Sequence, residues 1–114
     1  MSHLLTVCWW LLVAHAFTDY VFQSEFMANA KQPESTYRRD KYGPWWWWMA
    51  AHGLINGAGV VFATGYVWLG IVESVVHSVT DYAKCQGHIN TKQDQMIHVG
   101  SKGIYALIAA WRWW

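Results

Sequence analysis

Long apolar stretches separated by polar segments dominate the chain. The apolar stretches lie at residues 3–28, 45–63, 66–84 and 93–114. The polar segments that separate them lie at residues 29–43 and 85–91. An α-helix needs about twenty residues to cross a hydrocarbon core of roughly 30 Å, so the first and last stretches are long enough and the second and third only just so. The pattern predicts four helices, with a tight turn at Thr64 and Gly65 because glycine commonly ends a helix.

The expected fold is an all-α, four-helix transmembrane bundle in a single membrane-embedded domain, residues 1–114. An even number of crossings puts both termini on the same side of the membrane. The side with the two polar segments carries most of the basic residues: Lys31, Arg38, Arg39, Lys41, Lys84 and Lys92. The other side carries only Arg112. The positive-inside rule therefore predicts cytoplasmic loops and outward-facing termini.

The tryptophans support a membrane location. Six of the ten fall toward the terminal side of the expected bundle: Trp9, Trp10, Trp68, Trp111, Trp113 and Trp114. Residues 45–48 are four consecutive tryptophans that fall toward the other side. Aromatic residues are enriched at both membrane interfaces, whereas a small soluble core could hardly satisfy so many indole N–H groups. The mean hydropathy of +0.07 is low for a membrane protein, because tryptophan and the polar segments reduce it.

The beginning of the chain also resembles a signal peptide. Residues 4–13 are apolar, and Ala14-His15-Ala16 has the form of a small-residue cleavage site. No lysine or arginine precedes this stretch, and the apolar pattern continues to Phe26. We therefore expect an uncleaved membrane helix. Cleavage after Ala16 would remove His15, so the intact mass of the protein distinguishes the two cases.

Charge and cysteine content exclude some functions. The net charge is +1, and no long basic run is present, so nucleic-acid binding is not expected. Cys8 and Cys85 fall in different expected helices and do not form a zinc-finger motif. Both are expected to be free thiols.

Ionisable residues in the apolar stretches form a regular pattern. Three histidine–carboxylate pairs have a spacing of four residues: His15 with Asp19, His77 with Asp81, and Asp94 with His98. Residues four apart share one helix face, and buried ionisable groups usually pair or bind a metal. With His52, all seven fall in the cytoplasmic half of the expected bundle. They predict a site for one or two divalent ions, because nitrogen and oxygen ligands suit zinc, iron or manganese.

Other polar residues extend the same helix faces. Glu73 precedes His77 by four residues and is the candidate proton shuttle. Lys84 and Lys102 are candidates for stabilising negative charge on a substrate, and Gln23 and Asn56 for orienting ligands. The alternative for all these residues is structural, because polar side chains also hold membrane helices together by hydrogen bonds.

The order of the motifs resembles a known family. The matching stretches are His15-x3-Asp19-x3-Gln23, the single His52, His77-x3-Asp81-x2-Lys84 and Asp94-Gln95-x2-His98. They resemble DUF3307, an uncharacterised family of small bacterial and phage membrane proteins. The resemblance implies a multi-pass protein of the bacterial inner membrane but names no reaction. Thr18 stands where a glycine commonly precedes the first aspartate in that family. A weaker similarity links the chain to bacterial membrane-bound metal-dependent hydrolases.

These observations favour a metal-dependent hydrolase that acts on a phosphate ester or a lipid-linked substrate near the cytoplasmic interface. One alternative is a non-enzymatic protein that handles metal ions or protons through the same residues. Another is a structural or pore-forming small phage membrane protein. The bilayer is the expected partner, and residues 45–48 would serve equally as a lipid anchor or as the interface of a homo-oligomer.

Overall fold

The computed structural model describes residues 2–21, 23–33 and 43–112, and 86% of these residues are helical. No strand occurs among them, so the all-α prediction is confirmed. In chain order, the helices are α1 (Ser2–Ala16), the π-helix η1 (Phe17–Val21), α2 (Glu25–Ala30), α3 (Trp45–Thr64), α4 (Val67–Cys85) and α5 (Thr91–Arg112).

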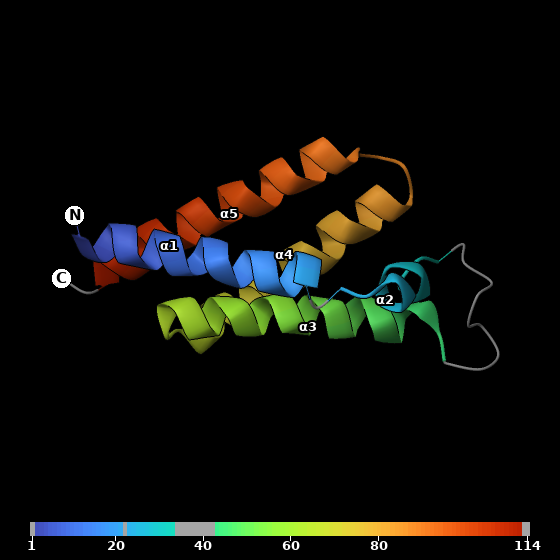
Figure 1. The fold of residues 1–114 in the computed structure, drawn as a ribbon, viewed down its shortest axis with the longest axis horizontal. Helices are drawn as coiled ribbons and strands as arrows, with labels where there is room; N and C mark the ends of the chain where they lie inside the picture. The colour runs from blue at the N-terminus through green and yellow to red at the C-terminus, as the bar shows by residue number, and fades with distance from the viewer. Residues whose placement is uncertain (1, 22, 34–42, 113–114) are drawn as a thin grey trace.

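The four long helices pack around a common axis. Helix α1 contacts α3 on one side and α5 on the other, and α4 packs along α3 and also contacts α5. Figure 1 shows that α1 begins and α5 ends at the same end of the molecule. The short helix α2 lies at the opposite end of the molecule, where it packs against α3. The connection between α4 and α5 is also at that end.

The prediction of one continuous helix over residues 3–28 is wrong in its second half. Helix α1 continues through η1 only to Val21, and a separate helix, α2, begins at Glu25. Ser24 adopts an extended conformation, and its hydroxyl accepts a hydrogen bond of 3.1 Å from the Met27 amide. Serine is a preferred residue at this position because it satisfies an amide that the helix leaves unpaired. The polar segment predicted from residue 29 therefore begins two residues later, after the end of α2. Residues 34–42 of this segment lie outside the described residues.

The remaining boundaries agree more closely with the sequence. Gly65 has a φ of 79° and ends α3, so the predicted turn is confirmed. Helix α5 begins at Thr91, two residues before the expected start. Asn90 and Gln93 cap each other there through reciprocal hydrogen bonds of 2.8 and 2.9 Å between side chain and backbone. Residues 113 and 114 of the expected fourth helix lie outside the described residues.

The interior is divided along the length of the bundle. Near the chain termini it is apolar, where residues such as Leu11, Val60, Leu69 and Ala106 pack together. Toward the opposite end it is filled by ionisable side chains. These buried groups include Asp19, Glu73, Asp81, Asp94, Lys31, Lys102 and the four histidines of the expected site.

The outer surface is apolar on every long helix. Trp9, Phe62, Ile71 and Leu107, one from each, are all more than 60% exposed. Within the described residues, one segment, His3–Val21, is long and apolar enough to cross a membrane. Signal sequences and core helices of soluble proteins share these properties, so this segment by itself does not establish a transmembrane bundle.

Glycine allows α3 and α4 to approach closely. A Cβ atom on Gly57 would overlap the Ser74 hydroxyl and the Gly70 carbonyl oxygen of α4. A Cβ atom on Gly53 would lie 2.9 Å from the Ser74 carbonyl oxygen. Small residues at such positions bring two helix backbones together and strengthen their packing.

We expect Gly57→Ala to lower the free energy of unfolding by about 1–3 kcal/mol, because the new methyl group must separate the two helices. The matched control is Gly103→Ala, because a Cβ atom there meets no atom within 4 Å. That control should leave stability unchanged or raise it by up to about 1 kcal/mol. Equilibrium unfolding of the purified protein measures both. Equal effects of the two substitutions would contradict the close α3–α4 contact.

Candidate metal centre

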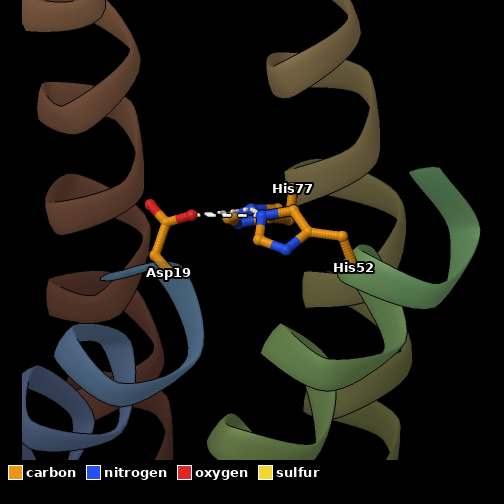
Figure 2. Close-up of side chains that lie close together, drawn as sticks. All are labelled: Asp19, His52 and His77. Atoms are coloured by element: carbon orange, nitrogen blue, oxygen red, sulfur yellow. Dashed lines mark hydrogen bonds and ion pairs between the residues drawn. The ribbon is translucent and has the colours of Figure 1, made fainter. Parts of the chain in front are cut away.

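Three ligand atoms from three helices meet inside the bundle. Figure 2 shows the Asp19 carboxylate of η1 pointing toward the rings of His52 on α3 and His77 on α4. Asp19 Oδ1 lies 3.1 Å from His52 Nε2 and 3.5 Å from His77 Nε2, and the two nitrogens lie 3.1 Å apart. All three side chains are at least 92% buried.

The dimensions of this triangle fit a divalent cation. Ligand atoms bonded to a tetrahedral zinc at about 2.0–2.2 Å lie roughly 3.3–3.6 Å from one another. The observed separations of 3.1 to 3.5 Å are close to that spacing. Two imidazole nitrogens and one carboxylate oxygen also bring several lone pairs together with few protons to share. A cation would satisfy all three atoms at once.

The π-helix η1 sets the position of Asp19. Single π-helical turns change the direction of the side chains that follow them and are frequent at functional sites. The Thr18 hydroxyl lies 2.9 Å from the Ala14 carbonyl oxygen and 2.8 Å from Asn56 Oδ1. Asn56 in turn donates to the His52 carbonyl oxygen on α3. These contacts tie the π-helical turn to the helix that carries His52.

Glu73 lies behind His77, on the side opposite Asp19. Its Oε1 atom is 3.3 Å from His77 Nδ1 and accepts a 2.6 Å hydrogen bond from the Lys102 ammonium group. All three side chains are at least 96% buried. A carboxylate beside the second nitrogen of a metal-binding histidine orients the ring and fixes its tautomer. Glu73 is placed for that role, and Lys102 balances its charge.

Asp94 and His98 of α5 line the opposite wall. Asp94 Oδ1 lies 3.1 Å from His98 Nε2, and the His98 ring stacks on the His77 ring with centroids 4.1 Å apart. Gln95 joins this wall to α1 and η1. Its amide nitrogen donates to Asp19 Oδ2 and Asp94 Oδ2, both at 3.1 Å, and its oxygen lies 3.1 Å from His15 Nε2.

Asp81 has cationic partners at the end of the site nearest α2. The Lys31 ammonium group pairs with Asp81 and also donates to Gln23. Lys84 lies 3.6 Å from Asp81 Oδ1 and 3.5 Å from Asp94 Oδ2, with 28% of its side chain exposed. Asp81 also lies 3.8 Å from His52 Nε2, so all seven expected ligands belong to one connected cluster.

The cluster is nearly balanced in charge. It contains the carboxylates of Asp19, Glu73, Asp81 and Asp94 and the ammonium groups of Lys31, Lys84 and Lys102. With neutral histidines, one net negative charge remains. Because an uncompensated charge is costly in a buried site, this excess favours the binding of a cation.

The residues that the four-residue spacing selects all lie in the buried cluster, but their contacts are not always those within each pair. Asp94 and His98 bond within their pair, whereas His15 and Asp19 lie 3.9 Å apart. His77 contacts Asp19 and Glu73 instead of Asp81. Asp19 comes from another helix, and Glu73 lies one turn before His77 on α4 rather than one turn after it.

Two central residues were not expected at the site. Lys31, treated in the sequence as a loop cation, is 97% buried. Its position just after α2 could have been anticipated only if the Ser24 cap had been recognised. Gln95 was part of a motif but had no assigned role. Its place beside Asp94 on the inward helix face was the available signal.

Comparison with known proteins identifies a family but no activity. A sequence model described as "Protein of unknown function (DUF3307)" matches residues 7–110. No curated protein matches the chain. No solved structure matches it either.

We expect Lys31→Met to lower the free energy of unfolding by about 3 kcal/mol, because it removes one partner of a buried ion pair. Adding Asp81→Asn should recover most of this loss, because a neutral amide then replaces the unpaired buried carboxylate. Chemical unfolding of the two single variants and the double variant gives the coupling energy. Lys92→Met, at an exposed position, is the control and should change stability by less than about 0.5 kcal/mol. Purely additive effects would contradict the pairing.

Proposed function

The chain belongs to the DUF3307 family, and we propose that it is an integral membrane hydrolase that uses a divalent ion held by Asp19, His52 and His77. The observation that carries the proposal is the meeting of their three ligand atoms within 3.5 Å of one another in a buried site. Zinc, iron or manganese suits this set of nitrogen and oxygen ligands. The proposed substrate is a phosphate ester, carried on a lipid or otherwise.

The distribution of side chains supports a membrane location. Soluble monomers rarely expose large apolar patches, yet here every long helix has a strongly apolar outer side. Ionisable residues within membranes face the bundle interior and pair with one another, as they do here. Helices α3, α4 and α5 have 20, 19 and 22 residues, and each is long enough to cross roughly 30 Å of hydrocarbon.

The buried ionisable residues explain why only one of the described segments, His3–Val21, has a high mean hydropathy. Helix α4 includes Glu73, Asp81 and Lys84, and α5 includes Asp94 and Lys102, all in the cluster. These residues lower the mean hydropathy of helices whose outer sides are apolar. We propose a multi-pass protein of the bacterial inner membrane, with outward termini and the connections near the site in the cytoplasm.

Hydrolysis of a phosphate ester needs an activated water and stabilisation of negative charge. A divalent ion at this site would lower the pKa of water and polarise the phosphoryl oxygens. Water then adds to phosphorus, the bond from phosphorus to the alcohol oxygen breaks, and the alcohol leaves with a proton. Lys84 is the best-placed side chain for holding the substrate anion, because it is the most exposed lysine of the cluster.

The roles of Glu73 and Lys102 follow from their depth in the bundle. Glu73 contacts His77 on the side away from Asp19, so we propose that it orients this ligand rather than shuttling a proton to the substrate. Lys102 is committed to Glu73 by a 2.6 Å hydrogen bond and neutralises its charge.

A groove on the outer surface supports a lipid-linked substrate. It has a volume of about 540 Å³ between α1 and α3, and its lining includes Trp10, Phe62, Gly59 and Thr18. Thr18, which immediately precedes Asp19 in the chain, belongs to this lining, whereas the proposed metal ligands do not. We propose that the acyl chain of such a substrate lies in this apolar groove.

Hydrolysis is favoured over transport by the division of the interior. A path for ions or protons requires polar groups along the whole length of the bundle. Toward the termini, the described interior is formed by apolar residues such as Leu11, Val60 and Leu69. The described interior therefore lacks a polar path through its apolar half.

We expect alkaline phosphatase fused to the C-terminus to be active in a bacterial host, because this enzyme requires export. The same enzyme inserted between Gly87 and His88, in the connection between α4 and α5, should be inactive. Green fluorescent protein at the same two positions is the control and should give the reverse pattern. The opposite result, or recovery of the protein in the soluble fraction, would contradict the proposed topology.

We expect the detergent-purified protein to retain a divalent metal that the double variant His52→Ala/His77→Ala loses. Elemental analysis measures the metal, and phosphate release from ester and lipid-phosphate substrates measures activity. Activity should fall at least about 100-fold with the metal. His88→Ala, at an exposed histidine, is the matched control and should keep both.

Either negative result would be decisive for part of the proposal. Absence of metal after attempted reconstitution would overturn the metal centre. Metal binding without hydrolysis of any phosphate ester would instead favour a protein that only handles metal ions.

A further inference from the structure

The wall formed by α5 contains a second set of converging ligands. Asp94, His98 and Asp19 each offer a ligand atom, and the three atoms lie within 4.8 Å of one another. All three side chains are at least 92% buried. This set shares only Asp19 with the proposed site of Asp19, His52 and His77.

Gln95 indicates where a second cation would lie. Its neutral amide group donates to two carboxylate oxygens, Asp19 Oδ2 and Asp94 Oδ2, both at 3.1 Å. The Lys84 ammonium group lies 3.5 Å from Asp94 Oδ2, whereas no ammonium group of the described residues pairs with Asp19 Oδ2. Two anionic oxygens that share one uncharged donor and one cation are incompletely compensated in a buried site. A divalent cation binds carboxylate oxygens at about 2.0–2.6 Å and would compensate both charges.

Asp19 is oriented to bridge two ions. Its Oδ1 atom faces His52 and His77, whereas its Oδ2 atom faces the amide of Gln95. The rings of His77 and His98 are nearly parallel, at 16°, with centroids 4.1 Å apart. Each ring would supply a ligand to one of the two ions, so the two ions would be neighbours.

We propose that a second divalent ion binds to Asp94, His98 and the Oδ2 atom of Asp19. This inference rests on the proposed function, because the first ion occupies the set of Asp19, His52 and His77. Gln95 gives up its two hydrogen bonds to the carboxylates when the second ion binds. Asp94 is then a metal ligand and Asp19 the bridge between two ions.

The charge of the cluster makes the second ion dependent on an anion. One net negative charge is present without metal, so a first divalent ion leaves one positive charge and a second leaves three. Such an excess is unfavourable in a buried site unless an anion enters with the ion. A phosphate group supplies that anion and has oxygens for both ions. Phosphate and the second ion therefore bind cooperatively.

The test is a titration of the full-length, detergent-purified protein with Mn²⁺, with and without inorganic phosphate. We expect two equivalents to bind, with phosphate raising the affinity of the second on the order of tenfold or more. Electron paramagnetic resonance should show exchange coupling between the two ions, because a carboxylate bridges them. Asp94→Asn and His98→Gln should each bind one equivalent and give an uncoupled signal.

Each alternative outcome has a separate meaning. One equivalent in the wild type and in Asp94→Asn, lost in His52→Ala/His77→Ala, would overturn the second site but keep the proposed function. Loss of all metal in a folded Asp94→Asn variant would also overturn it, because Asp94 would then bind the first ion. No Mn²⁺ binding, with no zinc or iron retained by the purified protein, would remove the proposed function itself. His88→Ala is the control and should behave like the wild type, and circular dichroism checks the folding of each variant.

Discussion

The burial of four carboxylates in an otherwise apolar molecule is the constraint on which this structure depends. Asp19, Glu73, Asp81 and Asp94 lose nearly all contact with solvent, and each requires compensation by a neighbouring charge or donor. Three lysines and four histidines supply it, and these partners come from every long helix as well as the segment after α2. The cluster therefore fixes how the helices face one another as much as their apolar contacts do.

Close packing makes this compensation possible. Gly57 and Gly70 let α3 and α4 approach until the Nε2 atoms of His52 and His77 are 3.1 Å apart. The π-helical turn of η1 then brings the Asp19 carboxylate within 3.5 Å of both nitrogens. Small residues and a local change of helix type thus determine the geometry of the candidate metal centre, although none of them supplies a ligand.

The remaining negative charge connects the structure to its proposed chemistry. With its histidines neutral, as metal binding requires, this cluster has one negative charge for a cation to neutralise. Because the ligands are held by separate helices, small helix movements would change the distances between them. Glu73 and its partner Lys102 restrict the movement of the His77 ring, because the imidazole is held between the carboxylates of Asp19 and Glu73.

The sequence alone determined the helical class, most helix boundaries and most of the residues that form the buried ionisable cluster. Apolar stretches of about twenty residues and histidine–carboxylate spacings are local patterns, and local patterns specify helices and their faces. Only the tertiary structure decided which side chains meet. His77 contacts Asp19 rather than Asp81, Lys31 enters the interior, and Gln95 joins two walls. Such contacts depend on helix order, helix crossing and the break at Ser24, because the groups involved are as much as 80 residues apart in the chain.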